Sequence, residues 1–128
     1  PPLKSILYVE DEPDIQTIAR LALQSVGGFE VFLCSSGGEA LKVAPTMKPD
    51  LILLDVMMPE MDGMATLGAL KRLEGSRDTP IIFMTAKVQT QEVQQYLDLG
   101  AIGVIPKPFN PMSLSQTVRN IWQAHHEP

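Results

Sequence analysis

The chain has 128 residues, of which 45% are hydrophobic and 20% are charged, with a formal net charge of −5. This length predicts one domain whose core needs no disulfide or structural metal, and no apolar run approaches the ~18 residues that cross a bilayer. The acidic balance argues against direct nucleic-acid binding and favours a protein partner or a metal ion. Cys34 is the single cysteine, which excludes an internal disulfide and suits a reducing cytoplasm.

Strand and helix patterns alternate along the whole chain. Apolar segments predict strands at residues 3–9, 29–34, 51–55, 80–85 and 102–105, and helical patterns follow them at residues 13–26, 37–44, 63–73, 86–99 and 111–122. The chain begins with two prolines, without an initiator methionine or a signal-peptide pattern, so we expect a processed protein or part of a longer one. Residues 1–128 are therefore interpreted as a single domain, with no output domain in this chain.

Several helix boundaries carry local signals. Pro13 suits a first helical position, Ser36 has a glutamate three residues later as in a capping box, and Asp62 and Asn110 are candidate N-caps. We expect the second helix to fray or kink near Pro45. The fourth helix is mostly polar, which predicts a short and loosely held element.

Polar side chains follow four of the five predicted strands. Glu10 and Asp11 follow the first strand, Asp55 ends the third, Thr85 ends the fourth and Lys107 follows the fifth. Strands that are apolar throughout indicate a parallel sheet covered on both faces, which makes this an α/β protein. Ligands of such sheets bind outside the carboxyl ends of the strands, where the strand order reverses. These five residues are therefore a candidate site.

These five residues carry a net negative charge that a bound cation would balance. Two carboxylates 4 Å apart repel by as much as ~4 kcal/mol at an effective dielectric near 20. Glu10, Asp11 and Asp55 sum to −3, Lys107 returns +1, and a divalent ion would balance the rest. Oxygen ligands without histidine or cysteine point to Mg²⁺. A carboxylate beside Mg²⁺, a lysine and a hydroxyl can also attack phosphorus, although any one of these residues alone is more simply explained as a turn acid or a solvated lysine.

The motifs at these strand ends are similar to those of a known family. They are Glu10-Asp11-Glu12-Pro13, Asp55-Val56-Met57-Met58-Pro59-Glu60-Met61-Asp62-Gly63, Thr85-Ala86, Gly100-Ala101 and Lys107-Pro108-Phe109. In order and spacing the chain resembles the receiver domain of bacterial two-component response regulators, the CheY-like superfamily, over essentially its whole length. The resemblance implies a flavodoxin-like fold, a doubly wound five-stranded parallel sheet in the order 2-1-3-4-5.

The resemblance also implies a phosphorelay function. Asp55 would accept a phosphoryl group from a phosphohistidine on a sensor histidine kinase or histidine phosphotransfer protein. Lys107 would pair with that group, Thr85 would move to bond it, and the peptide bond after Lys107 would be cis. The protein would be a phosphorylation-controlled switch that catalyses only its own phosphorylation and autodephosphorylation.

The same resemblance implies a Mg²⁺ site. Asp11 and Asp55 would bind the ion together with the backbone carbonyl of Met57, and Glu10 would act largely through a metal-bound water. The family commonly has Asp at the position of Glu10. A longer carboxylate still reaches the water shell of the metal.

A second departure concerns signal transmission. Three residues before Lys107 the family usually places an aromatic residue that turns inward as Thr85 moves, and this chain has Val104 there. We therefore hypothesise that the signal travels through motion of the fourth helix. The resemblance further implies a downstream protein or output domain as partner, and a phosphorylation-dependent dimer through residues 86–99, 102–105 and 111–122.

Two other function classes compete with the switch. A Mg²⁺-dependent phosphohydrolase usually carries a second Asp two residues after its nucleophile, where this chain has Met57. A pseudo-receiver that only binds proteins would be expected to lack Asp55 or Lys107, and both are present.

Overall fold

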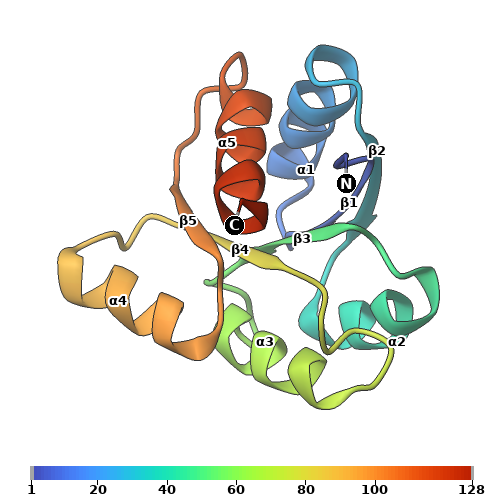
Figure 1. Ribbon diagram of the computed structural model, residues 1–128, viewed down its shortest axis with the longest axis vertical. Helices are drawn as coiled ribbons and strands as arrows, with labels where there is room; N and C mark the ends of the chain where they lie inside the picture. The colour runs from blue at the N-terminus through green and yellow to red at the C-terminus, as the bar shows by residue number, and fades with distance from the viewer. Residues whose placement is uncertain (1, 128) are drawn as a thin grey trace.

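The computed structural model describes residues 2–127 as a parallel sheet between two layers of helices (Figure 1). The strands are β1 Ser5–Val9, β2 Glu30–Cys34, β3 Leu51–Asp55, β4 Ile81–Thr85 and β5 Gly103–Pro106. The helices are α1 Pro13–Arg20, its π-helical continuation η1 Leu21–Val26, α2 Gly37–Met47, α3 Gly63–Arg72, α4 Thr90–Leu99 and α5 Leu114–His126. The strand order β2-β1-β3-β4-β5 confirms the predicted flavodoxin-like α/β fold.

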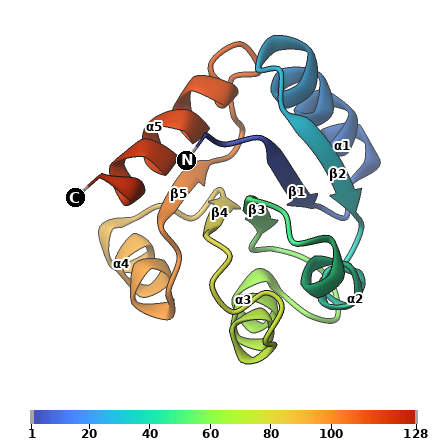
Figure 2. The same cartoon turned by 45° about the vertical axis from the view of Figure 1, so that its right-hand side comes forward.

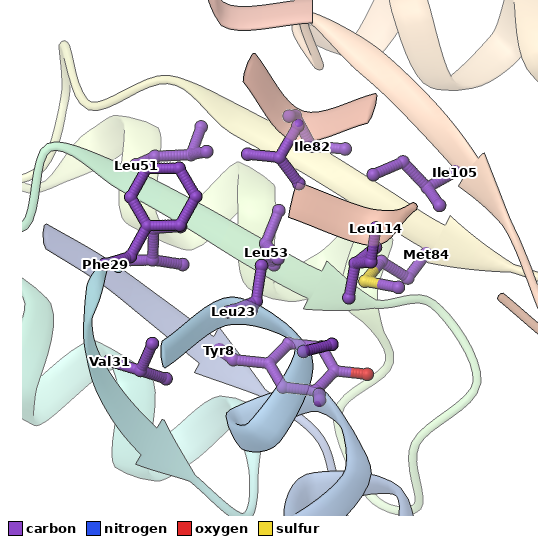
Figure 3. Packing of buried hydrophobic residues seen from close by; sticks show 14 of the residues in the cluster. Tyr8, Leu23, Phe29, Val31, Leu51, Leu53, Ile82, Met84, Ile105 and Leu114 are labelled. Atoms are coloured by element: carbon purple, nitrogen blue, oxygen red, sulfur yellow. The ribbon is translucent and has the colours of Figure 1, made fainter. Parts of the chain in front are cut away.

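The two faces of the sheet are covered by different helices. Figure 2 shows α1 and α5 on one side and α2, α3 and α4 on the other. Every residue of β3 and β4 is buried, which explains why these strands are apolar throughout instead of alternating. One apolar cluster, part of which is drawn in Figure 3, joins β1, β3 and β4 to α1, η1 and α5, and a second joins the same strands to α2, α3 and α4.

The strand order reverses between β1 and β3, which are neighbours in the sheet. Val9 pairs with Leu54 in the parallel register, so Glu10 and Asp55 come next at the same edge. From β1 the chain crosses to β2 on one side, and it later returns to β3 on the other. The two loops therefore diverge at the carboxyl ends of β1 and β3, the position at which sheets of this kind bind ligands.

The predicted helix caps have different outcomes. Ser36 Oγ accepts the amide of Glu39 at 3.1 Å and Asp62 Oδ1 accepts the amide of Ala65 at 2.8 Å, so both of these caps are confirmed. The Asn110 cap is wrong because α5 begins at Leu114. Asn110 Oδ1 instead accepts the amide two residues later, at 2.8 Å, and forms a local turn that competes with the helix.

Other helix boundaries also differ from the pattern. The second helix continues through Pro45 to Met47. The fourth helix starts at Thr90, not at residue 86, and has ten residues, of which only Tyr96 is buried. Val26 ends the π-helical turn and is exposed, and such a turn does not keep the 3.6-residue period of an α-helical apolar face. Within residues 2–127, no helix is long and apolar enough to span a membrane.

Candidate functional site

Three carboxylates meet at the carboxyl ends of β1 and β3. Glu10, Asp11 and Asp55 each place one carboxylate oxygen within 4.8 Å of the others. Glu10 and Asp55 are buried, with exposed fractions of 0% and 2%, whereas Asp11 is half-buried. The parallel register brings Glu10 and Asp55 together, and the turn after β1 adds Asp11. A desolvated set of hard oxygen donors fits Mg²⁺, which binds through one or two carboxylates and keeps several waters.

Lys107 supplies the positive charge of the site. Its Nζ atom lies 2.9 Å from Glu10 Oε1 and 3.3 Å from Asp55 Oδ1. Burial alone would lower the pKa of Lys107, but the hydrogen bond to Glu10 and the charges of Asp55 and Glu10 outweigh it, and the pKa lies above its usual value. The lysine therefore remains charged and bridges the two buried acids. The peptide bond between Lys107 and Pro108 is cis, as the resemblance implies.

Asp55 is held in a site that disfavours its charge. Burial, followed by the negative charge of Glu10, raises the pKa of Asp55 to about 6, although the charge of Lys107 lowers it. The Met57 amide lies 3.4 Å from Asp55 Oδ1 and is a long hydrogen-bond donor to it. Gly63 packs so closely against the backbone of Asp55 and Val56 that a Cβ atom would not fit, so the start of α3 lies directly against the end of β3. One cation cannot fully balance this cluster, so added positive charge should stabilise the ionised form.

Thr85 lies at the same edge, one residue beyond the partner of Asp55 in β4. Its side chain is buried, and its Oγ1 atom accepts the amide of Lys87 at 3.1 Å. Its carbonyl accepts the amide of Lys107 at 2.9 Å, which ties the ends of β4 and β5 together. The hydroxyl is thus bonded to the loop before α4, while the two acids and Lys107 contact one another directly.

A pair of aromatic rings packs next to Val104, the position at which the family usually has an aromatic residue. Val104 pairs with Phe83 in the sheet, and both belong to the cluster on the face of α2, α3 and α4. Tyr96 of α4 packs its ring edge-on against Phe83, with centroids 5.3 Å apart. The Tyr96 hydroxyl donates to the Lys87 carbonyl at 3.2 Å. A chain of hydrogen bonds therefore runs from Thr85 through Lys87 to α4.

Sequence reasoning missed Tyr8. Its hydroxyl donates to Glu10 Oε1 at 3.0 Å, and its side chain is fully buried. Burial, then the charge of Glu10, raises the pKa of Tyr8 far above its usual range, so the phenol stays protonated. The available signal was spacing, because residues two apart on a strand point to the same face. A polar tip within an apolar strand, two residues before the acid, indicates such a contact.

The chain is similar in sequence and fold to known proteins. Residues 6–119 match the response regulator receiver domain. The chain belongs to this family. It is 40% identical over 118 residues to the alkaline phosphatase synthesis transcriptional regulatory protein PhoP of Bacillus subtilis, covering 92% of the chain and 48% of that protein. It is also 40% identical over 111 residues to the phosphate regulon transcriptional regulatory protein PhoB of Pseudomonas aeruginosa, covering 87% of the chain and 48% of that relative. The chain thus spans about half the length of these curated relatives.

Solved receiver structures have the same fold. The Vibrio cholerae chemotaxis protein CheY4 superposes with a TM-score of 0.85 at 32% identity, covering 94% of this chain and 99% of that one. The receiver domain of a Pseudomonas aeruginosa sensor histidine kinase, solved with a magnesium ion in its active site cleft, gives a TM-score of 0.81 at 30% identity, covering 93% of this chain and 97% of that one. The protein is thus a CheY-like receiver domain of two-component signal transduction, a family of phosphorylation-controlled switches.

Proposed function

We propose that this receiver accepts a phosphoryl group on Asp55 from a phosphohistidine of a sensor histidine kinase or histidine phosphotransfer protein. The observation that carries the proposal is the buried Asp55 carboxylate with Lys107 Nζ at 3.3 Å and two further acids within 4.8 Å. Asp11 and Asp55 would hold Mg²⁺ together with the Met57 carbonyl, and Glu10 would act through a metal-bound water. The ion, when bound, supplies charge that neutralises phosphoryl oxygens.

The transfer forms one bond and breaks another. An ionised Asp55 oxygen attacks phosphorus, the bond between phosphorus and the histidine nitrogen breaks, and the nitrogen retains the electron pair. Because the pKa of Asp55 is about 6, the carboxylate is mostly ionised at neutral pH. Lys107 then pairs with the new phosphoryl oxygens, which carry more charge than the carboxylate it leaves.

The proposal limits the enzymatic activity of this site to its own phosphorylation and autodephosphorylation. Water would later hydrolyse the aspartyl phosphate. Met57 occupies the place of the second acid that phosphohydrolases use to protonate a leaving group, and a methionine cannot transfer a proton. Turnover of external phosphate esters is therefore not expected.

The test is phosphorylation by acetyl phosphate and Mg²⁺, followed by intact mass measurement. We expect one phosphoryl group per chain, lost in Asp55→Asn and after chelation of the metal. Asp14→Asn is the matched control, because Asp14 is an exposed residue in the first turn of α1 and should leave phosphorylation unchanged. Sustained hydrolysis of phosphate esters would instead support a phosphohydrolase, and an unmodified wild-type chain would support a pseudo-receiver.

We further propose that the phosphorylation signal reaches the surface through α4. When the Thr85 hydroxyl moves to the phosphoryl group, the amide of Lys87 loses its acceptor, and the loop that Tyr96 holds can rearrange. The aromatic residue that responds to phosphorylation would then be Tyr96 on α4, in place of the aromatic residue that β5 lacks at Val104.

Amide chemical shifts measure this transmission. With Mg²⁺ and beryllofluoride, a stable mimic of a phosphoryl group, residues 86–106 should shift in the wild type, and Tyr96→Phe should reduce those shifts by about half or more. Shifts near Asp55 should persist in the variant. Unchanged shifts in residues 86–106 of the wild type would contradict the path, as would a full response in Tyr96→Phe.

The partners and location belong to the same proposal. The receiver would work in the cytoplasm and control a downstream protein or an output domain, without itself binding nucleic acid or membrane. Phosphorylation would favour a dimer through α4, β5 and α5. Light scattering with and without beryllofluoride tests this dimer.

A further inference from the structure

Tyr8 brings an uncommon polar contact into the apolar centre of β1. Its ring lies in the cluster beneath α1 and α5 (Figure 3), and its side chain is fully buried. Its hydroxyl donates to Glu10 Oε1 at 3.0 Å. The rigid ring leaves the phenol little freedom, so the position of the Tyr8 oxygen fixes where the more flexible Glu10 side chain can end.

Glu10 Oε1 is shared by two donors. Lys107 Nζ lies 2.9 Å from the same oxygen to which Tyr8 donates, and the other carboxylate oxygen, Oε2, accepts the amide of Glu12 at 3.2 Å. Lys107 Nζ also lies 3.3 Å from Asp55 Oδ1. Lys107 is therefore divided between two buried acids. Among residues 2–127, only Glu10 has a second side-chain donor on the oxygen that contacts the lysine.

The division of Lys107 between Glu10 and Asp55 becomes important when Asp55 is phosphorylated and gains negative charge. New phosphoryl oxygens would attract Lys107 away from Glu10. Without Tyr8, that movement would leave the buried Glu10 Oε1 atom without a donor from the protein, which is unfavourable. With Tyr8, Oε1 keeps one hydrogen bond.

We infer that Tyr8 is a positioning residue for phosphoryl transfer: it holds Glu10 so that Lys107 is free to turn to the phosphoryl group on Asp55. The inference rests on the proposed function. It also gives the glutamate at position 10 a structural reason, because an aspartate is one methylene shorter and would leave the fixed phenol without its acceptor. Tyr8 and Glu10 thus act as a matched pair.

The test is a double-mutant cycle of Tyr8→Phe and Glu10→Asp, read by two titrations. We expect Tyr8→Phe to weaken beryllofluoride binding at saturating Mg²⁺ by about tenfold, the usual worth of one hydrogen bond to a charged group. Mg²⁺ binding alone should change less than about twofold, because it does not require Lys107 to leave Glu10. In the Glu10→Asp background, Tyr8→Phe should have no cost, because the hydrogen bond is already lost.

A metal-free readout accompanies the titrations. In urea unfolding without Mg²⁺, Glu10→Asp should lower the midpoint more with Tyr8 present than in the Tyr8→Phe background, since only the former leaves a buried phenol unpaired. Ser115→Ala is the control for a lost buried hydroxyl, because Ser115 Oγ donates to the Ala22 carbonyl at 2.7 Å in the packing between α5 and η1. It should lower stability without changing either affinity.

The outcomes separate this inference from the proposed function. If the wild type is phosphorylated and binds beryllofluoride, but Tyr8→Phe acts equally in both backgrounds, Tyr8 is only a core residue and the inference is overturned. Equal losses of Mg²⁺ and beryllofluoride affinity would also overturn it. If the wild type neither becomes phosphorylated nor binds beryllofluoride, the proposed function itself fails, and the inference falls with it.

Discussion

The β1–β3 edge and the α4 region are built differently. At the edge, Glu10 and Asp55 are buried, as is every residue of β3. In α4, Tyr96 alone is buried among ten residues, and Leu97 and Leu99 are exposed. The acids are therefore fixed by the core, whereas α4 is attached chiefly through one ring and one hydroxyl.

Under the proposed function, this difference suits the two regions to separate tasks. Phosphoryl transfer needs charged groups fixed in place, and the buried sheet edge provides this. A switch needs an element with a low free energy of local opening, and a helix with few buried contacts provides that. The hydrogen bonds from Thr85 through Lys87 to Tyr96 connect the two regions.

The largest expected contrast is in the packing of the two regions. Leu53 is fully buried at the centre of β3, and Leu53→Ala should lower the free energy of unfolding by about 3 to 4 kcal/mol through lost burial and a cavity. Leu97 of α4 is 40% exposed, and Leu97→Ala should cost less than about 1 kcal/mol. Urea unfolding measures both. Equal costs would show that α4 is as firmly packed as the sheet.

The next effect is a pH dependence at the sheet edge. The pKa of Asp55 is raised from 3.8 to about 6 in the folded protein. Below pH ~4 the carboxyl is neutral in both the folded and unfolded states, and its contribution to stability is fully present. As pH rises through about 6, the folded protein must hold the charge, so about 2 to 3 kcal/mol is lost.

Asp55→Asn isolates this effect. Its free energy of unfolding should rise relative to the wild type as the pH increases from 4.5 to 7.5. Saturating Mg²⁺ should restore stability to the wild type at neutral pH, because an ion that binds only the folded state stabilises it. If the free energies of unfolding of the two proteins followed the same pH dependence, the site would not disfavour the ionised form of Asp55.

The fold could be predicted because strand ends and sheet order follow general rules. Apolar strands alternating with helices specify a parallel sheet, and such sheets bring Glu10, Asp55 and Lys107 to one edge whatever the details of the loops. The contacts between these residues are what the structure adds. Pairing of Lys107 with both acids depends on side-chain conformations that no spacing rule gives.

Where a prediction failed, a local interaction formed in place of the expected one. Asn110 has the chemistry of an N-cap, but its side chain bonds the amide two residues on, and α5 starts later. Tyr8 was predicted only as part of an apolar strand, because its proposed role depends on Glu10 and on the charge of Lys107, which follows β5. Signal transmission through motion of α4 stays a prediction. What the sequence did not reveal is that Tyr96 packs against Phe83, the sheet partner of Val104.

The smallest effect gives the finest test of the two regions. Similar contacts occur at the N-terminal ends of α4 and α2. Glu92 Oε1 accepts the amide of Gln89, the N-cap of α4, at 3.1 Å, and Glu39 Oε1 accepts the amide of Ser35, the residue before the N-cap of α2, at 2.6 Å. Glu92→Ala and Glu39→Ala should each remove about 0.5 to 1 kcal/mol. If α4 opens independently of the sheet, Glu92→Ala should speed amide hydrogen exchange in α4 and leave global unfolding unchanged. Glu39→Ala should instead lower the global free energy, because three buried residues tie α2 to the core. A global loss of equal size in both variants would mean that α4 unfolds only with the whole domain, and a local switch would then need a different element.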